Sequence, residues 1–278
     1  RVPRQTVAKG FLSLGLTIGS HAALWTDPSP RAVAAFFALQ KIGAVVIMLN
    51  TCLKDGEIEK QLMCSDAEYV LLEGEEKAQS FLEACRSGME ACFAEGDLCL
   101  GQTVRVRTVV LSERPEEPPE LCPMPEPEPN AVARMLFTSG TTSAKYKVVC
   151  SSGAQLASSG RMKAGDMHMT EEDVVCCALP MFHTFCINCN ILASSAAGAC
   201  LVLPPDRHSE TTLTYIETYR CTILTAVPSV YLTLIARPDL RPERVASLRC
   251  GIVGGAYCSP EQFCAIERKL GMTLLPGL

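Results

Sequence analysis

Short apolar runs alternate with longer amphipathic stretches along most of this chain, and this alternation constrains its fold more than any other feature. Residues 44–49 (AVVIML) are apolar throughout, as expected of a strand that is buried on both faces. Residues 30–42 have a helical pattern, and Gly43 would end that helix. Strands that alternate with helices form parallel sheets covered by helices. We therefore expect an α/β fold.

A stretch rich in proline and glutamate, residues 113–130, divides this pattern in two. Such a segment buries little apolar surface, so we expect a linker between a first α/β subdomain, residues 1–112, and a second, residues 131–278. Helices are expected at 54–64, 78–92, 211–219, 229–235 and 260–270, and strands at 69–72, 104–111, 131–138, 148–151, 173–179, 199–203, 222–227 and 248–253. The last helix begins clearly, because Ser259 can cap it and Gln262 can complete a capping box.

Charge and hydropathy exclude several classes of function. The net charge is -5 and no run of Lys and Arg stands out, so we expect no nucleic-acid partner. The longest apolar stretch, residues 34–49, is interrupted by Gln40, Lys41 and Gly43, so we expect no transmembrane segment. No secretory signal is visible. These features predict a cytoplasmic protein.

The sixteen cysteines are many for a chain of this kind, and most lie within apolar runs, where they act as small hydrophobic residues. Cys186 and Cys189 form a lone C-x-x-C, without a second pair at zinc-finger spacing. We expect free thiols in a reducing compartment and no metal site.

The segment that carries most chemical information is residues 136–147, LFTSGTTSAKYK, between two expected strands. Its glycine lets a ligand approach the backbone closely, and its hydroxyl groups, exposed N–H groups and lysines can bind phosphate oxygens. The loop could hold the β- and γ-phosphates of ATP, although it is not a Walker loop. A polar surface turn is the alternative.

This segment resembles the phosphate-binding signature of the adenylate-forming superfamily, T-S-G-T-T-G-x-P-K-G. The superfamily includes acyl-CoA synthetases, luciferases and peptide-synthetase adenylation domains. The match covers residues 138–142. Beyond it, Ser143 replaces a glycine, Lys145 a proline, Tyr146 the lysine and Lys147 a glycine. The resemblance implies that Thr141 and Thr142 are catalytic and that the ATP-binding residues here are Thr138, Ser139, Gly140, Thr141, Thr142, Lys145 and Lys147.

Further segments resemble the same family in the expected order, from residues 14–50 onward. Residues 179–183, LPMFH, resemble L-P-L-F-H, which the family places beside the acyl substrate; this implies that Phe182 and His183 lie on the acyl side and that His183 is catalytic. Cys186 stands where glycine is common. Residues 225–231 resemble a V-P-x-x-Y step from strand to helix, which supports the fold more than any chemistry.

Residues 247–261 resemble the adenine-binding segment, S-L-R-x-x-x-x-G-G-A-P-L-S-P-E. The resemblance implies that Gly254, Gly255, Ala256 and Tyr257 contact the nucleotide. Tyr257 replaces the usual proline and could stack on adenine.

The resemblance implies two stacked parallel-sheet α/β subdomains of an adenylate-forming N-terminal domain, truncated before its end. The family's next motif, Y-G-x-T-E, would begin at about residue 275, so its Mg²⁺-binding glutamate, and the small C-terminal domain with its catalytic lysine, are expected beyond Leu278. The implied enzyme activates a carboxylic acid, expected to be a fatty acid, with ATP and transfers the acyl group to coenzyme A. This fragment alone is expected to be inactive.

Two other functions stay open from the sequence. The departures at Ser143, Lys145, Tyr146 and Tyr257 are compatible with a non-catalytic protein of the same fold that binds a nucleotide or an acyl group. An adenylation domain that feeds a carrier protein is the third possibility. Fold alone does not choose among the three.

Overall fold

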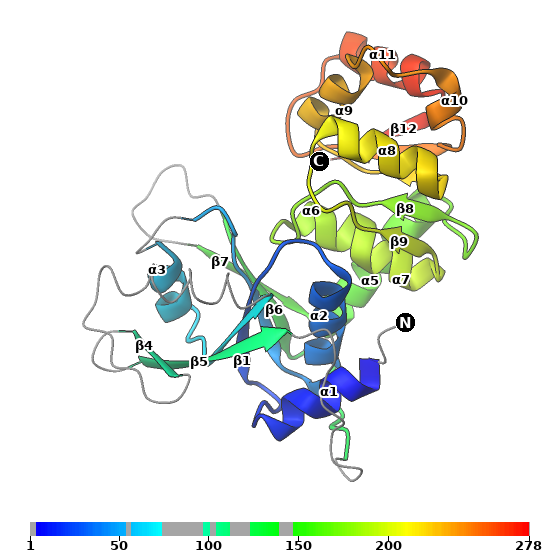
Figure 1. Cartoon of the computed structure of the whole chain (residues 1–278). Helices are drawn as coiled ribbons and strands as arrows, with labels where there is room; N and C mark the ends of the chain where they lie inside the picture. The colour runs from blue at the N-terminus through cyan, green and yellow to red at the C-terminus, as the bar shows by residue number, and fades with distance from the viewer. Residues whose placement is uncertain are drawn as a thin grey trace. The chain divides into compact units, whose positions relative to one another are not determined.

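The computed structural model of the chain describes residues 4–53, 57–73, 97–100, 104–111, 123–138 and 147–277. The chain divides into two compact units, residues 1–155 and 156–278. Figure 1 colours both units by residue number.

The described part of the first unit contains one sheet, with the strand order β4-β5-β3-β1-β2-β6-β7. Its strands are β1 (His21–Trp25), β2 (Val45–Met48), β3 (Tyr69–Glu73), β4 (Asp97–Leu100), β5 (Val104–Leu111), β6 (Val132–Phe137) and β7 (Val148–Ser152). β5, β3, β1, β2 and β6 are parallel, whereas the two edge strands, β4 and β7, run antiparallel to their neighbours. Parallel neighbours require crossover connections, and α2 (Pro30–Ile42) and α3 (Glu57–Cys64) supply those from β1 to β2 and from β2 to β3.

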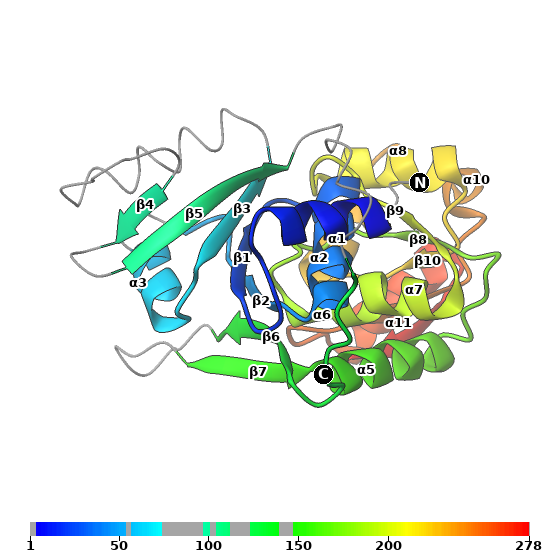
Figure 2. The ribbon, with the colours of Figure 1, turned by 90° about the horizontal axis from the view of Figure 1, so that it is seen from below.

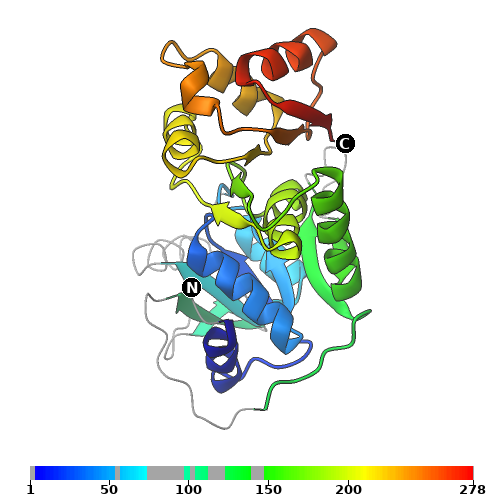
Figure 3. The ribbon, with the colours of Figure 1, turned by 90° about the vertical axis from the view of Figure 1, so that its right-hand side faces the viewer.

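The helices described in the first unit are α1 (Arg4–Ser13), α2 (Pro30–Ile42) and α3 (Glu57–Cys64). β2 and β3 lie on opposite sides of β1, so right-handed crossovers place α2 and α3 on opposite faces of the sheet (Figure 3). Ile58 and Leu62 of α3 pack on Ile47 and Val70. α2 packs against β1 and β2, and α1 packs on α2. Both faces of the central strands are therefore buried.

Local signals set the ends of α2. The Ser29 hydroxyl accepts a hydrogen bond from the Ala32 N–H at 3.0 Å, and Pro30 occupies the first turn. Gly43 ends the helix with φ +77°, a left-handed conformation that favours glycine. The expected helix over residues 30–42 is confirmed, including the glycine that ends it.

The second unit contains a parallel sheet with the strand order β12-β11-β10-β8-β9. Figure 2 labels three of these strands, β8, β9 and β10. Its strands are β8 (Val174–Cys176), β9 (Cys200–Val202), β10 (Ile223–Leu224), β11 (Cys250–Val253) and β12 (Thr273–Pro276). The helices of this region are α5 (Gly153–Asp166), α6 (Thr184–Cys186), the π-helix η1 (Ile187–Leu192), α7 (Ala193–Ala197), α8 (Ser209–Tyr219), α9 (Pro228–Ile235), α10 (Pro242–Val245) and α11 (Pro260–Leu270).

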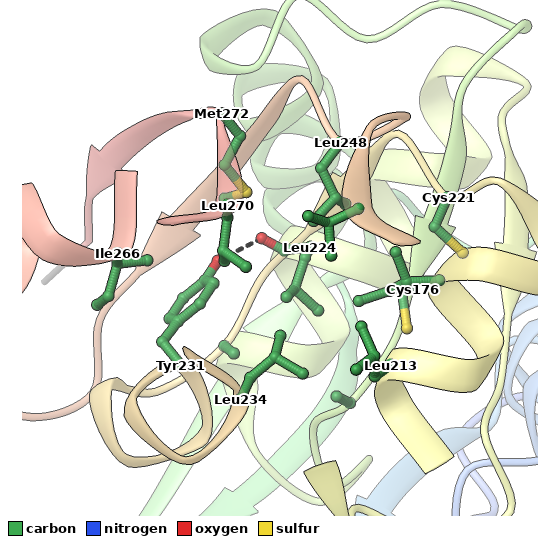
Figure 4. Packing of buried hydrophobic residues seen from close by; sticks show 14 of the residues in the cluster. Cys176, Leu213, Cys221, Leu224, Tyr231, Leu234, Leu248, Ile266, Leu270 and Met272 are labelled. Carbon is green, nitrogen blue, oxygen red and sulfur yellow. Dashed lines mark hydrogen bonds between the residues drawn. The ribbon is translucent and has the colours of Figure 1, made fainter. Parts of the chain in front are cut away.

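Two apolar cores cover the two faces of this second sheet. Neighbouring strand residues point to opposite faces, so Leu224 belongs to one core and Ile223 to the other. Figure 4 shows the first core, in which α8, α9 and α11 contribute Leu213, Tyr231 and Leu270. The second core includes residues of α5, η1 and α7. The expected α/β class with parallel sheets between helices is confirmed.

The division of the chain differs from the one expected at the Pro/Glu-rich stretch. β6 pairs with β2, and β7 pairs with β6, so residues 132–152 complete the first sheet and the second unit begins at Leu156. A parallel strand can join a sheet from a distant part of the sequence, and composition does not reveal the partner. Of the expected linker, residues 113–122 lie outside the described residues, as does the expected helix over 78–92.

Candidate functional site

The second sheet has a point at which the direction of chain progression reverses. β9 follows β8 and pairs with one of its edges, and β10 then pairs with the other edge. In parallel α/β sheets, ligands bind outside the carboxyl ends of the strands at such a switch point. The candidate site is therefore built from the segments that follow β8, β10 and β11.

The segment after β8 carries the expected acyl-side residues. Leu179 and Met181 are buried and anchor it, whereas Phe182 is half-buried and His183 is exposed. The rings of Phe182 and His183 have centroids 4.6 Å apart. The His183 N–H donates to the Pro180 carbonyl oxygen at 3.2 Å, and α6 begins directly after His183. The turn thus holds both rings at the edge of the sheet.

The electrostatic surroundings of His183 favour a neutral imidazole. Partial burial lowers the pKa of His183, and the positive charge of Arg207 lowers it further. Arg207 is exposed and follows β9, the neighbour of β8. Sequence motifs did not single out Arg207. Its position after a strand that ends at the same edge is the signal that could have found it.

The segment after β10 has a structural role. Pro228 starts α9, and the fully buried Tyr231 of that helix donates its hydroxyl to the Leu224 carbonyl oxygen. The same hydroxyl lies 3.3 Å from the carbonyl oxygen of Ile252. Tyr231 therefore connects α9 to two adjacent strands, in agreement with the view that the V-P-x-x-Y step serves the fold.

The segment after β11 carries the expected nucleotide-side residues. Gly254 is buried, and a Cβ atom there would lie 3.1 Å from the backbone of Gly277. The backbone segments at these two glycines therefore approach closely. Gly255 has φ +79°, which favours glycine. Ala256 and Tyr257 are exposed, and Tyr257 has a relative exposure of 83%. An exposed aromatic ring beside an exposed glycine backbone can receive a flat base.

The distance between these two segments follows from the sheet itself. β8 and β11 flank β10, so their carboxyl ends are two strand spacings, or about 10 Å, apart. The structure thus brings Phe182 and His183 to the same sheet edge as Gly254, Gly255 and Tyr257.

The phosphate loop belongs to the first unit. Its ends are held by β6 and β7, and the Thr138 N–H donates to the Lys147 carbonyl oxygen at 3.0 Å. Its central residues lie outside the described part of the chain: Ser139, Gly140, Thr141, Thr142 and Lys145. Their roles stay a prediction.

In the described ranges, no group of three or more His, Cys, Asp and Glu side chains is placed to hold a metal ion. Nor does any helix in those ranges have the length and apolar character to cross a membrane.

Comparison with known proteins gives a consistent result. The family described as AMP-binding enzyme matches residues 4–277. The chain is 26% identical to 4-coumarate–CoA ligase CCL1 of Humulus lupulus, over 95% of this chain and 48% of the relative. It is 28% identical to a crotonobetaine/carnitine–CoA ligase of Shigella flexneri, over 86% and 47%. The chain spans about half the length of the curated relatives it matches.

Solved structures show the same fold. ATP-bound MatB from Rhodopseudomonas palustris superposes with a TM-score of 0.80 at 22% identity, covering 98% of this chain and 52% of that protein. The anthranilate CoA ligase AuaEII in complex with anthranoyl-AMP gives 0.83 at 20% identity, covering 99% and 52%.

Proposed function

Because the chain belongs to the AMP-binding enzyme family, we propose that it is the N-terminal part of an ATP-dependent acyl-CoA synthetase. The enzyme activates a carboxylic acid, which we take to be a fatty acid, as an acyl-adenylate and then transfers the acyl group to coenzyme A. The observation that carries this proposal is the shared sheet edge, where the Phe182–His183 turn and the Gly254–Tyr257 segment flank the switch point.

The reaction requires little covalent chemistry from the protein. The substrate carboxylate attacks the α-phosphate of ATP and pyrophosphate leaves; the thiolate of coenzyme A then displaces AMP. The first step needs positioning and compensation of phosphate charge. In this proposal the hydroxyls of Thr141 and Thr142 and the amines of Lys145 and Lys147 supply that compensation. His183, kept neutral, packs beside the acid and can hydrogen-bond its carboxyl group without carrying charge.

The exposed backbone at Gly255 and the exposed ring of Tyr257 fit an adenine base, which needs a flat apolar surface and backbone hydrogen-bonding groups. Mg²⁺ would neutralise phosphate charge when bound with ATP. The described residues do not form a group of carboxylates that could hold the ion.

The two other functions make different predictions. A carrier-dependent adenylation domain would share acid-dependent adenylation without using coenzyme A. Both relatives above are CoA ligases by name, which favours a CoA ligase. A non-catalytic binding protein would bind nucleotide without acid-dependent exchange.

The test is ATP–pyrophosphate exchange by the longer protein that contains this chain. We expect exchange that depends on an aliphatic carboxylic acid, and we expect Thr141→Ala and Thr142→Ala each to weaken it. Removing both Lys145 and Lys147 should lower the exchange rate more than removing either alone. The total loss should be about 100-fold or more. Lys41→Ala, at an exposed position of α2, is the matched control.

The outcomes separate the hypotheses. Unchanged exchange in the double lysine variant would show that these lysines are surface residues. Absence of exchange with every fatty acid would favour the non-catalytic function. The 278-residue chain assayed alone is expected to form no acyl-CoA, and thioester formation by it would contradict that part of the proposal.

A further inference from the structure

Two cysteines that lie before and after the Phe182–His183 turn in the sequence are in contact. Cys177 directly follows β8, and Cys186 ends α6. Their Sγ atoms are 3.3 Å apart, and both side chains are buried. Cys189 stands three residues after Cys186 in the sequence, but the close thiol contact of Cys186 is with Cys177.

We propose that Cys177 and Cys186 are a redox-active pair that small hydroperoxides, such as hydrogen peroxide, convert to a disulfide. A disulfide needs the sulfur atoms about 2.05 Å apart, so the observed contact has to shorten by little more than an ångström. The two positions lie on separate elements, the end of β8 and the three-residue helix α6. A rotation within one short turn can supply this movement.

The surroundings favour Cys177 as the thiol that reacts first. The hydrogen bond with the Cys186 thiol lowers the pKa of Cys177 against the effect of burial. The thiolate is the nucleophilic form of cysteine. By contrast, burial raises the pKa of Cys189 to about 11, which disfavours its thiolate.

The chemistry balances with the peroxide as the two-electron oxidant. The Cys177 thiolate attacks one peroxide oxygen, the O–O bond breaks, and hydroxide leaves and takes up the proton released by Cys177, giving water and a sulfenic acid. The Cys186 sulfur then attacks the sulfenic sulfur, the S–S bond forms and the S–O bond breaks. The departing hydroxide takes the Cys186 proton as the second water.

Both thiols are buried, so the oxidant reaches them through a local opening of the chain. His183 and Thr184, at the start of the three-residue helix α6, are exposed, and local opening of α6 would move Cys186 away from Cys177 and open both sulfur atoms to the oxidant. The disulfide would tie β8 to α6 and hold the turn that carries Phe182 and His183. Its consequence for acid activation rests on the proposed function, whereas the linkage itself does not.

The test uses the 278-residue chain, hydrogen peroxide as the oxidant, alkylation of remaining thiols after denaturation, and peptide mass mapping. The exposed Cys52 and Cys64 serve as internal references for the extent of oxidation. We expect a Cys177–Cys186 linked peptide, loss of both alkylation sites, and recovery of both after dithiothreitol. Cys177→Ala and, independently, Cys186→Ala should abolish the link, and the buried control Cys189→Ala should retain it.

Two results would overturn the proposal. One is that Cys177 and Cys186 both remain alkylated after treatment that consumes the exposed thiols. The other is a disulfide between a different pair, such as Cys176 and Cys221, in place of this one. Mapping of the wild-type chain is decisive even where a variant fails to fold, and it is independent of any ATP-dependent activity.

Discussion

Arg249 donates two hydrogen bonds to Asp173, from Nε to Oδ1 at 2.8 Å and from Nη2 to Oδ2 at 2.6 Å. The same guanidinium donates to the carbonyl oxygens of Met167 and His168, each at 3.0 Å. Asp173 also accepts from the Thr222 hydroxyl at 2.6 Å. This network joins the residues before β8, β10 and β11, so it fixes the amino-terminal ends of the strands whose carboxyl ends form the candidate site.

The Asp173 carboxylate makes stability depend on acid. Burial raises the pKa of Asp173, but the hydrogen bonds from Arg249 and Thr222 outweigh it and bring the pKa to about 2. An aspartate in the unfolded chain titrates near pH 4, so the unfolded state binds more protons between about pH 4 and pH 2. The contribution of Asp173 to the free energy of unfolding should therefore be constant above this window. It should fall as the pH drops through the window.

Asp173→Asn should remove this part of the acid dependence, measured by urea unfolding at a series of pH values. Arg249→Lys keeps the charge but loses the two-pronged geometry, so it should retain only part of the dependence. An unaltered slope between pH 4 and pH 2 in Asp173→Asn would contradict the assignment.

Tyr231→Phe should destabilise the chain by about 1–2 kcal/mol, because it removes a buried hydroxyl that donates to carbonyl oxygens of two strands. The urea midpoint reports the change. Tyr219→Phe is the matched control, since Tyr219 has a relative exposure of 52% and its loss should change stability by less than about 0.5 kcal/mol. Equal effects of the two substitutions would show that the Tyr231 hydroxyl contributes nothing.

Gly251→Ala should prevent normal packing of β11. A Cβ atom there would overlap the Leu224 carbonyl oxygen and lie 2.7 Å from both the Met272 Cε and the Tyr231 Oη atoms. Since the first of these is backbone of the adjacent strand, side-chain adjustment cannot relieve the overlap. Gly165→Ala, in the open environment of α5, should instead stabilise by about 0.5–1 kcal/mol. Thermal unfolding of both variants tests the contrast, and a Gly251→Ala variant as stable as wild type would refute it.

Arg207→Gln should raise the pKa of His183, because a nearby positive charge disfavours the imidazolium and the substitution removes it. The contribution of burial remains, so the pKa should stay below that of an ordinary histidine. NMR titration of the His183 ring protons measures both. The exposed Arg241→Gln is the control and should leave the His183 titration in place; a similar shift in both variants would argue against a specific effect of Arg207.

The helix ends were predictable from local chemistry. Ser259 accepts from the Gln262 N–H at 3.3 Å, and the Gln262 side chain accepts from the Ser259 N–H at 3.0 Å, as the capping box requires. The sequence pattern predicts no element over residues 184–197, yet they form α6, η1 and α7. Their sequence mixes Ser, Asn and Cys with apolar residues, and a π-helix has no simple 3.6-residue period to recognise.

The order of motifs by itself determined the family and the α/β class, because periodicity, caps and glycine turns are local properties that a single sequence displays. Only the tertiary structure decided that β6 and β7 complete the first sheet and that the thiol of Cys186 contacts that of Cys177. Both are contacts between residues that are separated in the sequence. Which segments pair depends on burying the apolar residues of both faces of a sheet at the same time. That depends on the whole chain, so no single stretch of sequence reveals it.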